Sequence, residues 1–496
     1  MGAIAKQGTA SIFFIFIGFF IGTISNLFFL PFWFSKDELG QVQYFISWGI
    51  VFSQFFTLGS GSLAVRYYAK WKSEGKEGVV LFICLIFPII GSVIFSVFMA
   101  LFGQWYVHNT TEKLLISVDD AVIITLLFTI ILTFIKTYSG LAIALKQVWQ
   151  YFFLNEVFVR FGTLAVFGLC FYHYLTYLQL IYAILLIYLL MLSLTVLFQG
   201  NKWINGMRVP DKAELKESVQ YGMYAFFDTG ATVLVNRLDI LMVIALMGTQ
   251  GNIQGQILAM ALNIASIVMM PWRSMSTAAS PYIAEAVNNN DYKVVETIYK
   301  KTSVNCLLAG GWLMVLILCG TTEIFTLIPD NYTAAIIPLI IICVARITDM
   351  LSSVNGLIIV LTKYFRWNLY FNLMVIVFSI LANLVLIPLY GIIGVSVGTL
   401  LVVVFSNLLK GLYVYKKLAI HPFHKKTFYV LALLGVLLGI GLLMPVFTKA
   451  VLLNLIIKSA ILTILFTLAM LFTHISEDMR KIGRSYLSRV GIRLKD

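Results

Sequence analysis

Arginines inside long apolar runs are the residues of this sequence with the clearest chemistry, which is the binding of oxyanions. Arg237 lies within the apolar run 221–247, and Arg346 lies within the run 333–361. A guanidinium stays protonated at cellular pH and donates parallel hydrogen bonds to a phosphate or a carboxylate. An ionisable side chain at bilayer depth costs about 2.5–3.5 kcal/mol on insertion scales, so both residues must face protein or a water-filled cavity. We therefore predict that Arg237 and Arg346 bind an anionic group.

Three further arginines belong to the candidate site. Arg160 follows Glu156 by four residues, the favoured helical spacing for an acid before a base. This pair can neutralise itself and stabilise packing, or it can contribute Arg160 to a cationic cavity with Glu156 as counter-ion. Arg66 and Arg273 are expected at the inner ends of their apolar runs. Their charged ends can extend to the membrane surface there, or they can serve only to set the membrane topology. The same position would also allow them to guard a cytoplasmic entrance to the cavity.

Aspartates accompany the interior arginines. Asp349 follows Arg346 by three residues, and Asp228 and Asp239 flank Arg237. Eleven residues make about three helical turns, so Asp228 and Asp239 share one face of a straight helix, with Arg237 on the opposite face. We predict that these aspartates are counter-ions of the arginines or sites for a coupling ion.

The elements that hold these residues must be membrane helices. Of the 496 residues, 60% are hydrophobic and only 11% are charged, and the mean hydropathy is +0.94. A soluble domain cannot cover its surface with so few polar residues, so the sequence is that of a polytopic membrane protein. The predicted fold class is therefore all-α, with about 14 transmembrane helices at roughly 20 residues per span.

Hydropathy places six spans in the first half of the chain and eight in the second. They lie near residues 8–33, 41–64, 79–103, 119–142, 148–172, 174–198, 218–247, 254–275, 302–325, 333–361, 367–388, 390–414, 427–447 and 451–473. The run 333–361 is long enough to be tilted or broken.

We predict two six-helix lobes followed by an accessory helix pair, an arrangement expected of transporters built from internal repeats. Residues 1–198 would form the N-terminal lobe and residues 218–414 the C-terminal lobe, joined by a cytoplasmic linker at 199–217. An accessory helix pair would occupy 427–473, followed by a basic cytoplasmic tail at 474–496.

The positions of lysine and arginine predict that both termini are cytoplasmic. With fourteen spans and an inside N-terminus, only Lys36, Lys113, Lys449 and Lys458 fall outside. The other basic residues beyond the spans lie on the inner side, which is the positive-inside pattern. Because they are dispersed among the spans, the net charge of +13 does not indicate nucleic acid as a partner.

Motifs for other chemistry are absent from the sequence. It has no GxxxxGK[ST] phosphate loop, no HExxH motif and no glycine-rich dinucleotide turn. The five cysteines lie singly in apolar runs, and His421 and His424 belong to a basic loop, so neither a metal site nor a cofactor is predicted. The expected outer loops are short and nearly free of charge, which disfavours an enzyme.

Several segments together resemble the polysaccharide exporters and Wzx-type O-antigen flippases of the multidrug/oligosaccharidyl-lipid/polysaccharide (MOP) superfamily. The resemblance covers most of the chain. Its motifs are LGQVQY (39–44), TLGSGSLAVRYYAK (57–70), NRLDILMV (236–243), ASPYIAEAVNNNDYKVVETIYKK (279–301) and NLVLIPLYGIIGVSVGT (383–399). In the last of these, Pro388 and Gly391 are typical of a tight outer turn, and Gly394 and Gly398 leave a face for close helix packing.

This resemblance implies alternating access, by two six-helix lobes around a central cavity (an inverted V), in the inner membrane of a bacterium. The implied cargo is an undecaprenyl-pyrophosphate-linked oligosaccharide, moved from the cytoplasmic to the outer leaflet for O-antigen (lipopolysaccharide), capsule or exopolysaccharide synthesis. Membrane lipids, a polymerase and glycosyltransferases are the implied partners. No cofactor is expected, and coupling to a proton, sodium or anion gradient stays open.

Three alternatives remain open. A lipid II flippase would carry a peptidoglycan precursor in place of the oligosaccharide. A MATE-like multidrug or cation antiporter would be satisfied by twelve spans and would have an acidic cavity. A membrane glycosyltransferase or polymerase of lipid-linked sugars is the alternative of another class, and the short outer loops weigh against it.

Overall fold

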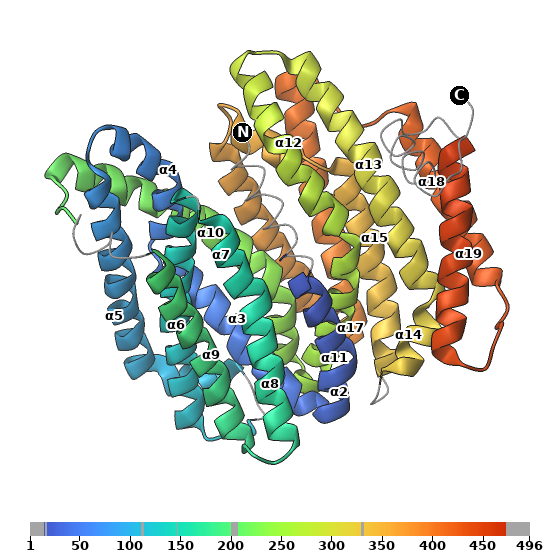
Figure 1. Ribbon diagram of the computed structural model, residues 1–496, viewed down its shortest axis with the longest axis horizontal. Helices are drawn as coiled ribbons and strands as arrows, with labels where there is room; N and C mark the ends of the chain where they lie inside the picture. Colours follow the sequence, from blue (N-terminus) through green and yellow to red (C-terminus); the bar gives the residue numbers. More distant parts are fainter. Residues whose placement is uncertain are drawn as a thin grey trace. The chain divides into compact units, whose positions relative to one another are not determined.

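Long apolar helices make up the protein (Figure 1). The computed structural model describes Phe14 and residues 17–110, 114–145, 147–199, 207–328 and 332–472. It is 88% helical, with no strand in the described ranges. Within them, nine helices are long and apolar enough to cross a membrane, or up to twelve if each bent pair counts as one span. The predicted all-α fold of a multi-pass membrane protein is confirmed, and the count of fourteen spans stays a prediction.

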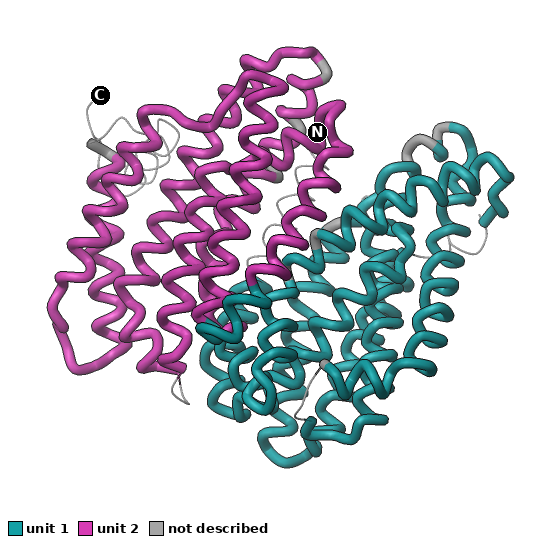
Figure 2. Tube along the Cα trace, turned by 180° about the vertical axis from the view of Figure 1, so that it is seen from behind, with its two compact units in different colours: residues 1–257, 383–392 teal, residues 258–382, 393–496 magenta. Residues whose placement is uncertain are grey.

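The chain divides into two compact units, which Figure 2 colours separately. Unit 1 comprises residues 1–257 and 383–392, and unit 2 comprises residues 258–382 and 393–496. A division by packing does not say which helices move together. The predicted lobes (1–198 and 218–414), the linker and the accessory pair therefore stay predictions, and the predicted tail at 474–496 lies outside the described residues.

Unit 1 is a bundle in which α4, α5 and α6 enclose a hydrophobic core that includes Leu63, Trp71 and Leu141. Capping boxes start two of its helices: Ser35 with Glu38 at α3, and Asp211 with Glu214 at α10. The helices of the unit are η1 (Ser25–Phe29), α2 (Leu30–Trp33), α3 (Lys36–Phe56), α4 (Ser60–Ser73), α5 (Glu77–Thr110), α6 (Val118–Ala144), α7 (Val148–Phe152), η2 (Phe153–Phe158), α8 (Val159–Phe171), α9 (Tyr177–Gln199), α10 (Lys212–Leu246) and η4 (Gly248–Gln250).

The start of α10 is tied to the turn between α4 and α5. The Glu214 carboxylate lies 3.2 Å from Lys76 Nζ and 3.8 Å from Arg208 Nη2. The hydrogen bond to Glu214 raises the pKa of Lys76. The Glu214 N–H, which donates to Asp211 Oδ1 at 2.8 Å, holds the pKa of Asp211 below its ordinary value. The contribution of this cap is therefore present above the ordinary aspartate pKa and is lost as the pH falls through the lowered one.

A sharp break separates α3 from α4, whose axes differ by 52°. Leu58 (φ 48°) and Gly59 (φ 75°) are both left-handed there. A Cβ on Gly59 would lie 2.6 Å from the carbonyl oxygen of Gly222 in α10, so glycine is required both for its conformation and for the close approach of the two backbones.

Gly59→Ala is expected to destabilise the protein by about 1–3 kcal/mol more than Gly75→Ala, because only the first adds a collision to the left-handed strain. Gly75 has a similar φ of 69°, but a Cβ there would meet nothing within 4 Å. Unfolding of both purified variants in detergent, followed by circular dichroism, measures the difference. Equal losses would mean that the Gly59–Gly222 contact is unimportant.

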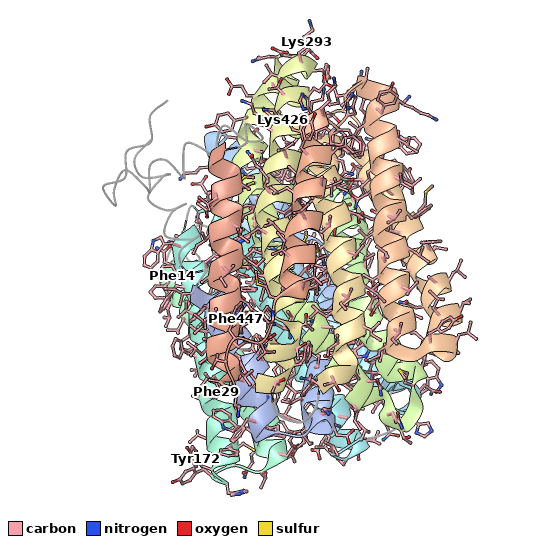
Figure 3. All side chains as sticks on the ribbon, turned by 90° about the vertical axis from the view of Figure 1, so that its right-hand side faces the viewer. Phe14, Phe29, Tyr172, Lys293, Lys426 and Phe447 are labelled. Carbon is pink, nitrogen blue, oxygen red and sulfur yellow. The ribbon has the colours of Figure 1, made fainter. Side chains whose placement is uncertain are left out.

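Unit 2 packs α12, α13, α16 and α17 around a core that includes Ile283, Tyr299, Ile358 and Val414. In Figure 3, Lys293 at the start of α13 and Lys426 at the start of α18 lie toward one end of this unit, and Phe447 lies farther along it. The helices that follow η4 are α11 (Gly251–Val268), α12 (Met270–Asn288), α13 (Tyr292–Cys319), α14 (Thr321–Leu327), η5 (Tyr332–Ala335), α15 (Ile336–Ser352), α16 (Asn355–Leu361), α17 (Arg366–Leu418), α18 (Lys425–Leu443) and α19 (Val451–Phe472).

The run 333–361 is broken, one of the two outcomes predicted for it. α15 ends at Ser352 and α16 begins at Asn355, with Ser353 in a left-handed conformation (φ 41°) between them. Backbone carbonyls at the break accept hydrogen bonds from side chains of neighbouring helices. The Trp272 indole donates to the Ser353 carbonyl at 2.8 Å, and the Ser303 hydroxyl donates to the Leu351 carbonyl at 2.8 Å.

α17 is a hairpin of two helices. The backbone leaves helical geometry at Gly391 (φ 59°), three residues after Pro388. Within unit 2, Lys410 bonds Asn372 at 3.3 Å, and the rings of Phe378 and Phe405 lie 4.6 Å apart. Pairs whose members are equally far from residue 391 can meet only if the two halves run antiparallel. The tight turn predicted at Pro388 and Gly391 is therefore present.

A buried ion pair connects α14 with α19. Lys458 Nζ lies 2.7 Å from Glu323 Oε1, and the two side chains are 11% and 7% exposed. The Asn454 amide donates to the same carboxylate oxygen at 2.6 Å and accepts from the Phe447 N–H at 2.9 Å. The sequence analysis counted Lys458 as falling on the outer side of the membrane; in the structure it lies within α19 and ties this helix to α14.

Candidate functional site

α10 carries three of the predicted site residues and bends by 59° between Val235 and Arg237. Asp228 lies before the bend and Asp239 after it. The inference that the two aspartates share a face assumed a straight helix, so it does not carry over to this one. Broken membrane helices line the substrate sites of many transporters. Arg237, at the bend, occupies such a position.

Lys136 of α6 is a second cation in the interior of unit 1. Its ammonium donates to the Ile50 carbonyl at 2.8 Å and to Gln54 Oε1 at 3.0 Å. The Gln54 amide in turn donates to the hydroxyl of Thr229, which directly follows Asp228 in α10. Neutral oxygens of α3 thus hold this lysine in place and leave its charge uncompensated.

Arg237 and Lys136 lie close enough to interact electrostatically. No ion pair of either residue with a carboxylate occurs within the described ranges. Two neighbouring interior cations repel each other, and burial adds a desolvation cost to each. An anion between or beside them would relieve both costs, so this cation pair has the electrostatics of a phosphate site.

Arg160 and Glu156 form the predicted ion pair, with Arg160 Nη2 2.7 Å from Glu156 Oε2. A Cβ on Gly22 would collide with Arg160 Nη1, so the guanidinium occupies space that only glycine leaves open. The Tyr188 ring of α9 lies within electrostatic reach of both Arg160 and Arg237. With Asp228 and Asp239 of α10, the interior of unit 1 therefore holds three cations and three carboxylates.

Asp239 accepts a hydrogen bond from the Asn383 amide at 2.9 Å. Asn383 belongs to the tip of the α17 hairpin, which is part of unit 1. The contact occupies one oxygen of the carboxylate and gives Asp239 a neutral neighbour. Whether this residue balances an arginine or binds a coupling ion stays a prediction.

In unit 2, Arg346 lies close to Asp349, as their spacing predicts. Arg346 Nη1 is 3.5 Å from Asp349 Oδ2, and the Asn407 amide donates to Asp349 Oδ1 at 2.9 Å. Arg346 therefore has a carboxylate beside it, whereas Arg237 has none in the described ranges.

Arg66 and Arg273 lie at exposed positions on α4 and α12. The Arg66 guanidinium stacks over the Tyr221 ring of α10 at 4.7 Å, a cation–π contact. Neither arginine is brought into the Arg237–Lys136 pair by an observed contact. Their predicted role as entrance residues stays a prediction.

Known structures share this arrangement of helices. A multidrug resistance MATE family transporter of the MOP superfamily in an inward-facing conformation matches with a TM-score of 0.63 and 14% identity, over 84% of this chain and 94% of that one. The lipid II flippase MurJ matches with a TM-score of 0.64 and 14% identity, over 94% of this chain and 99% of that one. A MOP superfamily transporter from Pyrococcus furiosus matches with a TM-score of 0.58 and 14% identity, over 82% and 95%.

The fold is that of the MOP-superfamily transporters. No protein-family model and no curated protein matches the sequence. At 14% identity the likeness extends to the fold alone, so the cargo must be argued from the residues that this chain places in it.

Within the MOP fold, Lys136 is the site residue that the sequence analysis missed. A lysine alone in the apolar run 118–144 was itself a signal, because a charge at that depth needs a partner or a function. Its pairing with Arg237 was not visible, since α6 and α10 are far apart in the chain.

Proposed function

We propose that this protein moves a lipid-linked oligosaccharide across the membrane, with undecaprenyl pyrophosphate as the lipid carrier. The observation that carries the proposal is the Arg237–Lys136 pair, two interior cations that form no ion pair with a carboxylate in the described ranges. A pyrophosphate supplies the missing negative charge and accepts bidentate hydrogen bonds from a guanidinium.

Two further observations support a flippase. The MurJ structure, described as a lipid II flippase, is matched over 94% of this chain, against 84% for the inward-facing MATE transporter. In the interior of unit 1 the basic side chains equal the carboxylates in number, whereas a cation antiporter calls for an acid-dominated cavity. Lipid II itself carries a pyrophosphate, so the cation pair does not separate it from other lipid-linked sugars.

The finer proposal places the protein with the Wzx-type flippases that serve O-antigen, capsule or exopolysaccharide synthesis. In this proposal the protein lies in the inner membrane with both termini in the cytoplasm, and it transports its substrate without catalysing a reaction. Glycosyltransferases supply the substrate, and a polymerase consumes it. Asp228, Asp239, Asp349 and Glu156 are the carboxylates through which a proton, sodium or anion gradient would be coupled.

The direct test is reconstitution of the purified protein in vesicles with a fluorescent undecaprenyl-pyrophosphate-linked oligosaccharide. The expected result is protein-dependent movement of the label between leaflets, measured by dithionite quenching. Lipid II and a cationic dye serve as competing cargoes. Transport of the dye with no movement of either lipid would support an antiporter in place of a flippase.

Cysteine labelling tests the proposed topology. In a variant lacking the five native cysteines, Ser117→Cys at the start of α6 should react with an impermeant maleimide from outside whole cells. Lys425→Cys at the start of α18 should react only after the membrane is opened. The reverse pattern would invert the proposed orientation.

A further inference from the structure

Unit 2 has its own polar group at the break between α15 and α16. Arg346 and Asp349 lie in the last two turns of α15, and Asn355 is the first residue of α16. Irregular backbone at membrane depth occurs where it is buried in protein or lines a water-filled cavity. The Arg346 and Asp349 side chains are each 24% exposed, so this group is open to a ligand.

A chain of hydrogen bonds joins these residues to α17. Asn407 donates to Asp349 at 2.9 Å, Asn355 Nδ2 donates to Asn407 Oδ1 at 3.3 Å, and Asn355 accepts from the Gly356 N–H at 2.6 Å. Some hydrogen-bonding groups of this network have no partner in the described ranges. Arg346 Nε is buried without a hydrogen-bond partner in the described ranges, and the only bond of this guanidinium is the long contact of 3.5 Å to Asp349.

Aromatic rings lie next to this polar group along the α17 hairpin. The Tyr413 ring lies 5.1 Å from Trp367, 5.3 Å from Phe371 and 5.8 Å from Tyr364. Trp367 is 43% exposed, and the Tyr413 hydroxyl is buried without a partner in the described ranges.

The Lys410–Asn372 bond connects the polar and aromatic parts. Lys410 lies one helical turn from Asn407 on one side and one turn from Tyr413 on the other, and it is within electrostatic reach of Asp349. Asn372 directly follows Phe371 of the aromatic cluster. The two parts are therefore contiguous in unit 2, and the exposed members of this surface are Trp367 and the Arg346–Asp349 pair, because Phe371 and Asn372 are buried.

We propose that this surface binds a sugar of the transported lipid-linked oligosaccharide, an inference that rests on the proposed function. A sugar hydroxyl both donates and accepts, so it pairs with a carboxyl, an amide or a guanidinium. The C–H face of a sugar ring is apolar and packs on an aromatic face. The Asp349 carboxyl beside Arg346 disfavours a phosphate there by like charge, in contrast to the Arg237–Lys136 pair of unit 1.

Two soluble probes test this assignment on the full-length protein in detergent. One is a short-chain polyprenyl pyrophosphate, and the other is the same molecule carrying one N-acetylhexosamine. Calorimetry should give a tighter Kd for the glycosylated probe. Asp349→Asn is expected to raise the Kd of the glycosylated probe by about tenfold and that of the plain pyrophosphate by less than about twofold. Loss of a buried polar partner matters only when the sugar is present.

Trp367→Ala is the second variant, since its exposed ring can be removed with little effect on folding. Trp367→Ala should weaken binding of the glycosylated probe but not of the plain pyrophosphate. Trp105→Ala, which removes a 67% exposed ring of unit 1, should weaken neither. Arg237→Ala should weaken both probes. If wild type binds both probes equally, or if Asp349→Asn and Trp367→Ala weaken both alike, the sugar site is refuted while the flippase stands. If wild type binds neither, the proposed function itself fails.

Discussion

Arg237→Ala is expected to reduce the initial rate of lipid-linked oligosaccharide transport in vesicles by at least about 30-fold. Truncating one member of a desolvated charge pair typically costs about 2–5 kcal/mol, and each 1.4 kcal/mol is a factor of ten. Here the pair is the guanidinium and a phosphate of the cargo. Lys136→Ala should have an effect of similar size, because the proposed site sets both cations against the same phosphate.

The controls separate a site from a general loss of positive charge. Lys216→Ala removes one exposed cation from the same helix α10 and should change the rate less than twofold, since exposed charges contribute about 1 kcal/mol or less. Arg237→Lys keeps the charge but loses the planar fork, so partial transport is expected. Normal transport by both Arg237→Ala and Lys136→Ala, at equal protein per vesicle, would rule out the cation pair as the phosphate site.

The sequence predicted those features of the fold that depend on hydropathy and on helix-breaking residues. The apolar runs became helices because a backbone in lipid must satisfy its own hydrogen bonds. The hairpin turn at Pro388 and Gly391 followed from residues that cannot continue a regular helix. The length of the run 333–361 was enough to predict a tilt or a break, although the position of the break at Ser353 depends on donors supplied by Trp272 and Ser303.

The pairing of charges was predictable only within one helix. Glu156 with Arg160 and Arg346 with Asp349 follow from spacings of four and three residues. Lys136 is held by oxygens of Ile50 and Gln54, more than eighty residues away, and no periodicity connects them. Such pairings are decided by how helices cross, which is a property of the folded bundle.

The ion pair of Lys458 could not be predicted from sequence spacing either, because its partner Glu323 is 135 residues earlier in the chain. Lys458→Ala is expected to lower the free energy of unfolding by about 3–5 kcal/mol, since it strands a buried carboxylate without its counter-ion. Titration of the purified protein with SDS in bicelles, followed by tryptophan fluorescence, measures this loss. The ring of Trp312 stacks on Phe466 of α19 at 5.5 Å and should report release of that helix.

The double variant Glu323→Gln, Lys458→Met decides whether the pair stabilises α19 or only fixes its position. Removing both charges takes away the desolvation cost of each along with their attraction, so stability should recover most of what Lys458→Ala loses. Lys449→Ala removes an exposed lysine from the connection between α18 and α19 and should stay within about 0.5 kcal/mol of wild type. If the double variant is as unstable as Lys458→Ala, the stranded carboxylate is not the cause. The loss would then come from the hydrogen bonds of Asn454 and the packing of α19 on α14.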